Sequence, residues 1–219
     1  MRNILLITLF LTASLWASSW QKLKPTLSYK TDDYQLTTIE CLEFREYLLN
    51  ENNTALLNKK PHITLSICPN RASENLRKFH NTKPKLSSKH YMRQIGDYHD
   101  DSCDYEVNAF VLDSKGTVYR MDENKDPLAY LAPLNTPAKV ALALDLLDIK
   151  GGEKYRTKGK GIEVKTTQVD SNPKDNYCVK NEYLYQLSLS GEIISKKLLK
   201  SKKLKEECIY PYIMPCDKY

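Results

Sequence analysis

Apolar and polar residues in the middle of the chain follow the patterns of a β-hairpin and a helix. The segment YEVNAFVLDSKGTVYRM carries alternating apolar residues on both sides of a turn at 113–116, where Gly116 is free to take a positive φ. Further along, Thr136 as N-cap and Pro137 at the first helical position open a helix that ends before Gly151. This helix is apolar almost all round, so we expect it in the core.

Alternation with a period of two continues in the C-terminal third. In GIEVKTTQV, Ile162 and Val164 are expected to face inward, and Glu163 between them to face outward. The segment EYLYQLSLSGEIISKKLL predicts a second hairpin, which turns at Ser190–Gly191.

The N-terminal half shows helix-like patterns instead. TTIECLEFREYLLN begins with Thr37 three residues before Glu40, as in a capping box, and its apolar residues recur at helical spacing. We therefore predict a helix over residues 37–50. HITLSIC, residues 62–68, is a short β-rich run. Asn70 can cap a second helix, formed by RASENLRKFH.

Together these elements predict an α+β fold. A smaller helical N-terminal part, residues 20–100, precedes a sheet-containing part, residues 101–219. In the second part about five antiparallel strands form one sheet with the apolar helix packed on it. Residues 81–104 lack a period and are expected to form a long loop. We expect 20–219 to be a single domain, because about 200 residues suffice for one core.

The first 19 residues have the layout of a secretory signal peptide. Arg2 gives a positive start, an apolar run follows to Leu15, and small residues stand at Ala17 and Ser19. Cleavage is expected after Ala17 or after Ser19, and a buried N-terminal helix is the alternative. The sequence therefore predicts a secreted or periplasmic protein. No later stretch approaches the roughly 20 apolar residues of a membrane span, so we expect a chain that is not membrane-spanning.

Six cysteines lie outside the predicted signal peptide, and this even number predicts three disulfides in an oxidising compartment: Cys41, Cys68, Cys103, Cys178, Cys208 and Cys216. Cys41–Cys68 would join the first helix to the strand after it. The second hairpin would place Cys178 opposite about Lys203, which favours a Cys178–Cys208 bridge. Cys103–Cys216 is then left by elimination. No CxxC pair occurs, which disfavours a zinc ribbon or thioredoxin-like chemistry.

One stretch concentrates residues that could carry chemistry. KHYMRQIGDYHDDSCDY, residues 89–105, contains His90, His99, Asp100 and Asp101. The two histidines are nine positions apart, which matches no zinc motif, and the spacing of a calcium-binding EF-hand is absent. General acid–base catalysis by His99 with a neighbouring aspartate is one interpretation, and a metal site completed from elsewhere is another. The interpretation we adopt is a solvated loop anchored by Cys103.

Two segments are rich in cations. The run KKLLKSKKLK suits an anionic surface, whether nucleic acid, polysaccharide or lipid headgroups, through Lys196, Lys197, Lys200, Lys202, Lys203 and Lys205. Lysines also discourage aggregation at a sheet edge, and the run lacks the arginine and interleaved aromatics of base-stacking sites. GGEKYRTKGKG, residues 151–161, fails as a phosphate-binding loop because it follows a helix and leads into a strand. It is predicted to be a mobile basic turn.

Composition adds little to these assignments. Charged residues make up 27% and hydrophobic ones 41%, as in a globular protein, and the net charge of +6 falls to +5 when Arg2 is removed. No catalytic, metal or dinucleotide motif occurs, so no cofactor is expected. We predict an exported, non-enzymatic binding domain whose partner is a protein or an envelope component rather than nucleic acid. The alternative is a secreted hydrolase, metal-assisted or not, that uses His99 and its aspartates.

Overall fold

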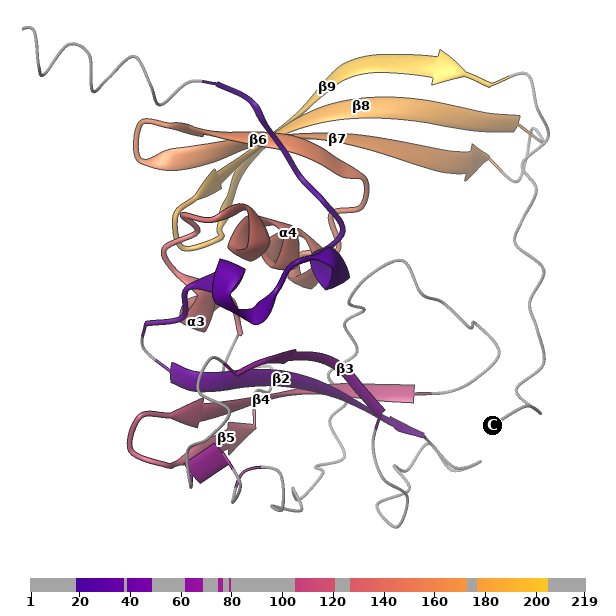
Figure 1. Ribbon diagram of the computed structural model, residues 1–219. Helices are drawn as coiled ribbons and strands as arrows, with labels where there is room; N and C mark the ends of the chain where they lie inside the picture. The colour runs from indigo at the N-terminus through magenta and orange to yellow at the C-terminus, as the bar shows by residue number, and fades with distance from the viewer. Residues whose placement is uncertain are drawn as a thin grey trace, which may run out of the picture.

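The computed structural model describes residues 19–37, 39–48, 62–68, 75–76, 79, 105–120, 127–172 and 177–204. Within these ranges the strands form two antiparallel sheets, with helical segments between them (Figure 1). The predicted signal peptide, up to residue 18, lies outside the described residues. In the part of the chain that is described, no helix is long and apolar enough to cross a membrane.

The first sheet has five strands in the order β1-β6-β7-β8-β9. These strands are β1 (Gln21–Lys22), β6 (Gly152–Lys158), β7 (Gly161–Asn172), β8 (Tyr177–Ser188) and β9 (Ile193–Lys203). Strands β6 to β9 follow one another as antiparallel neighbours, whereas β1 comes from the start of the chain and pairs with β6. The predicted second hairpin is confirmed, and Gly191 takes a φ of 94° in its turn.

The second sheet has four strands in the order β3-β2-β4-β5. They are β2 (Ile39–Leu48), β3 (His62–Ile67), β4 (Tyr105–Asp113) and β5 (Val118–Arg120). The predicted first hairpin is β4–β5. Gly116 has a φ of 82° in its turn and donates its N–H to the Asp113 carbonyl oxygen at 3.0 Å. The Asp113 carboxylate accepts the N–H groups of Lys115 and Thr117, which closes the turn.

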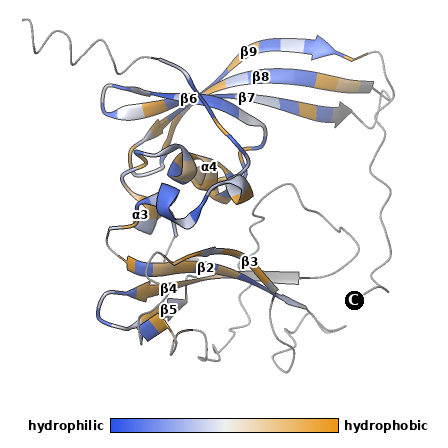
Figure 2. Cartoon of the chain, viewed as in Figure 1, coloured by the Kyte–Doolittle hydropathy of each residue, from blue (hydrophilic) through white to orange (hydrophobic). Residues whose placement is uncertain are grey.

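Four short helical segments lie between the two sheets (Figure 1). They are the 3₁₀ helices η2 (Thr26–Ser28) and η3 (Thr31–Tyr34) and the α-helices α3 (Leu128–Leu131) and α4 (Pro137–Leu146). The predicted caps of α4 are confirmed, since the Thr136 hydroxyl accepts the Lys139 N–H at 3.2 Å. The helix is buried nearly all round because a sheet lies on each side of it. Figure 2 shows the apolar residues gathered in this layer.

The predicted helix over residues 37–50 is wrong, because Ile39–Leu48 form the strand β2. Both faces of this strand are buried. Leu42 and Phe44 pack in the main core with α4, while Cys41 and Tyr47 pack in a second cluster on the other face. Phe79, whose backbone is helical, belongs to that second cluster. A strand buried on both faces loses the alternation that identifies strands, so its apolar residues resembled a helical pattern.

The prediction of one five-stranded sheet is also wrong, because the chain forms two sheets and three of the strands lie in the part predicted to be helical. The antiparallel pairing is confirmed. The segment 151–161 is not a basic turn but contains the strand β6, and only Gly159–Lys160 form a turn. In β6, Tyr155 faces the core while Lys154 and Arg156 on either side of it do not. The residues of β6 do alternate between the two faces of the sheet. Most of the outward-facing residues are cations, so the segment was interpreted as a basic turn.

Candidate functional site

The outer face of the five-stranded sheet is turned away from α4 and carries a large positive net charge. Along β7, Ile162 and Val164 belong to the core, so Glu163 and Lys165 lie on the outer face. Paired residues on neighbouring strands lie on the same face of a sheet. The register therefore carries this face across all five strands, for example through the pair Arg156–Glu163.

We call this surface the basic face. Its cations are Lys22, Lys154, Arg156, Lys158, Lys165, Lys180, Lys197, Lys200 and Lys202. Among these paired positions lie two glutamates, Glu163 and Glu182, so nine positive and two negative side chains give a net formal charge of +7. Glu153, at the bulge of β6, has no paired position and is not counted, although it lines the depression beside Lys154. The whole chain has a net charge of +6. The other charged residues of the chain sum to about −1, so the paired positions of this face carry a charge equal to the whole positive excess. Figure 2 shows β6–β9 as the more hydrophilic sheet.

Trp20 lies over the β6 and β7 part of the basic face. The Arg156 guanidinium is 4.6 Å from its ring centroid, and the ammonium groups of Lys165 and Lys154 are 4.8 and 6.0 Å from it. Strand β1, which begins one residue later, holds Trp20 there through its pairing with β6. The indole and Lys154 also line an open depression of about 630 Å³ next to β1. An aromatic ring among cations provides a flat apolar surface beside anion-binding groups.

Glu163 lies at the centre of the basic face and is only 2% exposed. Its carboxylate accepts hydrogen bonds from Arg156 Nε and Lys158 Nζ, both at 2.7 Å, and from Gln186 at 3.3 Å. Burial alone would raise the pKa of this carboxyl, but the hydrogen bonds from Lys158, Arg156 and Gln186 lower it to about 2. The prediction that Glu163 faces outward is therefore only partly correct. It lies on the outer face, but its cationic partners cover it.

The Glu163 carboxylate has a positioning role on this face. It accepts a hydrogen bond from the Arg156 guanidinium, which lies 4.6 Å from the centroid of the Trp20 ring. Lys154 and Lys165 lie beside the same ring. The arrangement therefore combines one ordered Arg–Glu pair with several long cationic side chains, which suits binding of an extended anion better than chemistry on a small one.

The predicted lysine cluster is divided by the sheet. Lys197, Lys200 and Lys202 lie on the basic face, opposite Leu184, Glu182 and Lys180. Lys196 and Lys203 lie on the other side of β9, and Lys205 lies outside the described residues. The Lys196 ammonium is 4.2 Å from the centroid of the Tyr183 ring. Its pKa is raised mainly by a hydrogen bond with Tyr185.

Sequence reasoning missed most of the basic face. Trp20, Lys22, Lys165 and Lys180 were not candidates, and the cations of β6 were assigned to a turn. The alternation of Lys154, Arg156 and Lys158 is a signal that could have identified β6 as a strand with one basic face. Trp20 could not be found in this way, because the cations that it contacts, Lys154, Arg156 and Lys165, come far later in the chain.

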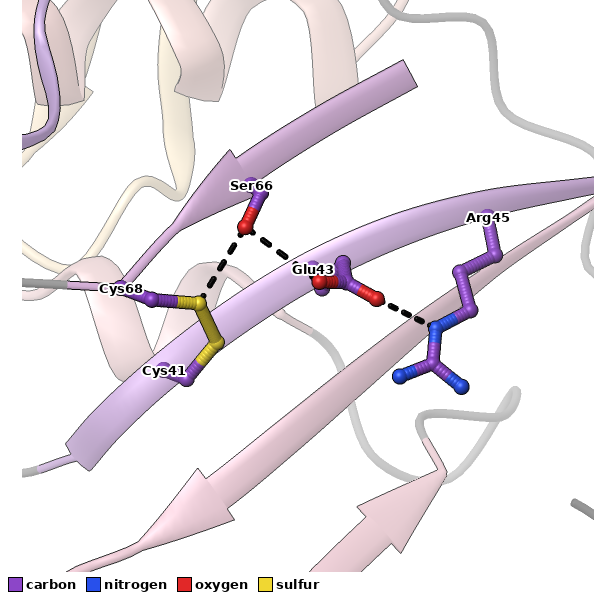
Figure 3. The surroundings of a disulfide bond; sticks show 5 residues. All are labelled: Cys41, Glu43, Arg45, Ser66 and Cys68. Atoms are coloured by element: carbon purple, nitrogen blue, oxygen red, sulfur yellow. Dashed lines mark hydrogen bonds and ion pairs between the residues drawn. A yellow bond between two sulfur atoms is a disulfide. The ribbon is translucent and has the colours of Figure 1, made fainter. Parts of the chain in front are cut away.

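A second polar cluster surrounds the disulfide between Cys41 and Cys68 (Figure 3). The disulfide joins β2 to the end of β3, so the predicted pairing is found, but it connects two strands rather than a helix and a strand. The Ser66 hydroxyl lies 3.2 Å from Cys68 Sγ and 3.3 Å from the Glu43 carboxylate. Glu43 in turn accepts a 2.5 Å hydrogen bond from Arg45 Nε.

This cluster is a structural centre. Arg45 lies between the rings of Phe79 and Phe110, at 4.7 and 4.6 Å from their centroids. The possible ligand atoms of Cys41, Glu43 and Cys68 lie within 4.8 Å of one another. The two sulfurs are bonded to each other, however, and Glu43 is paired with a cation, so the set lacks the thiolates that a metal site would need.

The remaining cysteines are partly described. Cys178 is disulfide-bonded, and its carbonyl oxygen accepts the Leu204 N–H at 2.8 Å, so Cys178 lies within one residue of the predicted position opposite Lys203. The proposed partners Cys208, Cys103 and Cys216 lie outside the described residues. The bridges Cys178–Cys208 and Cys103–Cys216 therefore stay predictions.

The histidine-rich stretch also lies outside the described residues. The catalytic interpretation of His90, His99, Asp100 and Asp101 therefore stays a prediction, as does the hydrolase alternative. Comparisons with protein-family models, with curated proteins and with solved structures find no match for this chain.

Proposed function

We propose that the protein is an exported binding domain whose basic face binds an anionic polysaccharide of the cell envelope. The observation that carries this proposal is the net charge of +7 on one sheet face, in a chain whose total is +6. Such a charge distribution attracts a polyanion from a distance and orients it toward the sheet. The cations are spread over five strands, so the ligand is an extended polymer rather than a small ion.

Trp20 favours a polysaccharide over other polyanions. Its ring lies among Arg156, Lys165 and Lys154, so a sugar unit could contact the ring while its acidic group contacts a cation. Insertion into lipid would need exposed aliphatic side chains on the basic face. Of the five exposed aliphatic side chains in this sheet, the register places Val169 on the basic face, whereas Ile193 and Leu198 lie on the other face, opposite Leu187 and Tyr183. Nucleic acid is disfavoured by the proposed export.

Export is supported by two features. The first 19 residues have a charged start, an apolar run and small residues at the predicted cleavage site. In addition, Cys41–Cys68 is a disulfide and Cys178 is disulfide-bonded, and such bonds persist in oxidising compartments. Mass spectrometry of the protein recovered from its native cells would give a chain starting at Ser18 or Trp20. An intact N-terminus would contradict export through a cleaved signal peptide.

The binding proposal is tested with residues 20–219, three ligands and a salt series. We expect binding to dextran sulfate, no binding to neutral dextran, and loss of binding at about 1 M salt, where the screening length falls to about 3 Å. Calorimetry measures the binding of each ligand and its dependence on salt concentration. Binding to anionic phospholipid vesicles without binding to dextran sulfate would assign the face to lipid and contradict the proposal. If the protein binds neither dextran sulfate nor the vesicles, the proposal that the basic face binds a polyanion is overturned.

Paired variants locate the site. Lys154→Gln with Lys197→Gln removes two charges from the basic face, whereas Lys30→Gln with Lys115→Gln removes two exposed charges elsewhere. Each lost ion contact is worth about 0.2–1 kcal/mol, so the first pair should weaken binding about twofold to thirtyfold and the second should not. Trp20→Leu should weaken binding to dextran sulfate while leaving the charge unchanged. Equal effects of the two lysine pairs would show that only the total charge matters.

A further inference from the structure

Strand β9 forms the open edge of the five-stranded sheet. In the described part of the chain it pairs only with β8. All eleven of its residues are exposed. Every second residue of such an edge strand directs its N–H and C=O away from the sheet, where a further strand can bind them.

The side chains of β9 are an unusual combination for a free edge. The strand reads IISKKLLKSKK, with five lysines and no acidic residue. Lysines alone would be the common protection against edge-to-edge pairing. Yet Ile193, Ile194, Leu198 and Leu199 are 47, 64, 51 and 43% exposed, and they are four of the seven large hydrophobic side chains found exposed in the described residues. Exposed aliphatic residues work against that protection and indicate a partner.

The charge of the strand decides what kind of partner fits. A second copy of β9 would place lysines opposite lysines, and like charges directly across a strand pair are destabilising. An acidic strand would place carboxylates opposite the same lysines. Its apolar residues would cover Leu198 and Leu199 at the same time.

We propose that β9 binds an extended, acidic segment of another protein as an additional strand of this sheet. The proposal rests on the backbone edge, the aliphatic residues and the lysines of β9. It shares Lys197, Lys200 and Lys202 with the basic face but does not involve Trp20 or β6. The partner segment alternates acidic with aliphatic or β-branched residues.

The register shows which part of the edge is regular. β9 has an extra residue relative to β8 at two places, between Ile193 and Ser195 and between Leu198 and Lys200. These bulges interrupt pairing. The stretch 200–203 has no shift and carries three lysines. It is therefore the stretch with which an acidic strand pairs, and Leu198 and Leu199 directly precede it.

The hydrogen-bond pattern identifies a residue that tests the edge alone. The Leu204 N–H is bonded to Cys178 O of β8 at 2.8 Å. In an antiparallel pair, N–H groups point alternately toward and away from the partner strand. Ser201, three residues before Leu204 in an unshifted register, therefore directs its N–H away from β8. Ser201→Pro removes this outward donor and leaves the β8–β9 bonds intact, and edge strands tolerate proline at such positions.

The probe is a twelve-residue peptide of alternating glutamate and valine, and binding to residues 20–219 is measured by calorimetry. We expect the peptide to bind, Ser201→Ala to bind equally, and Ser201→Pro to bind about tenfold more weakly or worse. Leu198→Ser should also weaken binding. A peptide of alternating lysine and valine should not bind. Circular dichroism and unchanged binding of dextran sulfate show that each variant is folded.

A second experiment uses the unaltered protein, so it does not depend on whether the proline variant folds. The same glutamate–valine peptide, N-methylated at alternate residues, cannot donate along one edge and should lose binding to the unaltered protein. No binding of the unmethylated peptide would overturn the proposal. So would equal binding of the methylated peptide, which would show attraction by charge only. Sedimentation that shows reversible dimers lost in Ser201→Pro would assign the edge to a second copy of this chain and would also overturn it.

Discussion

Replacing Glu163 with glutamine removes the one buried carboxylate of the basic face while keeping its shape. The pKa of this carboxyl falls from 4.5 to about 2 on folding, because hydrogen bonds from Lys158, Arg156 and Gln186 outweigh burial, which acts in the opposite direction. At about 1.36 kcal/mol per pKa unit, this fall corresponds to a ceiling of about 3.4 kcal/mol. The side chains of Arg156 and Lys158 are 28% and 60% exposed, so solvent screens the pair. We therefore expect Glu163→Gln to lower the free energy of unfolding by about 1–2 kcal/mol at pH 7.

The pH dependence has a definite sign. The unfolded carboxyl binds a proton at a higher pH than the folded one, so the stabilisation is complete above about pH 4.5 and is lost as the pH falls through about 2. Urea unfolding of the protein and of Glu163→Gln between pH 7 and pH 2 should show two curves that converge toward pH 2.

Glu182→Gln is the matched control, because it removes the same charge from the same face. It should change stability by less than about 0.5 kcal/mol, as surface substitutions usually do. A Glu163→Gln deficit that is as large at pH 2 as at pH 7 would refute the ion-pair argument and leave only a packing effect. The same variant raises the charge of the basic face from +7 to +8, so it should bind dextran sulfate at least as tightly if Trp20 keeps its place.

Three further substitutions test other parts of the fold by urea unfolding. Replacing both Cys41 and Cys68 with alanine should lower the free energy of unfolding by about 3.5 kcal/mol, because the disulfide closes a loop of 27 residues. In this double variant, a reductant should cause no additional loss of stability that is due to the Cys41–Cys68 bond. Arg45→Met should cost about 3–5 kcal/mol, because it removes the cation that lies beside the buried Glu43 carboxylate. Adding Glu43→Gln should recover part of the loss, and full additivity of the two substitutions would contradict the pairing. Thr136→Ala should cost about 1 kcal/mol through the lost helix cap, and Thr136→Ser should restore it.

The correctly predicted elements are those whose determinants are local. Gly116 and Gly191 both take a positive φ in their turns, and each fixes a hairpin within a few residues. Thr136 and Pro137 define the start of α4 in the same local way. Strand β2 was assigned incorrectly because its burial on both faces depends on residues far from it: α4 covers one face and Phe79 packs in the cluster on the other. A pattern within one segment does not show what covers that segment.

The candidate site could be predicted only in part for a related reason. The lysines of β9 are close together in sequence and were recognised, although the sheet places three of them on the basic face and two on the other face. The rest of the basic face is contributed by β1, β6, β7 and β8, whose register no local pattern contains. Trp20 depends entirely on the pairing of β1 with β6. Long-range pairing therefore limited the prediction of the site more than residue chemistry did.

The pairing of β1 with β6 also sets the order in which the site can be assembled. Gln21 lies opposite Tyr155, and the Tyr155 hydroxyl donates a hydrogen bond to the Gln21 side chain across 134 residues of sequence. During synthesis the segment with Trp20 emerges first and its place on the sheet emerges much later. A nascent or truncated chain that ends before β6 thus contains the tryptophan but no surface to receive it. The part of the basic face that contains Trp20 can therefore form only after β6, Gly152–Lys158, has been synthesised.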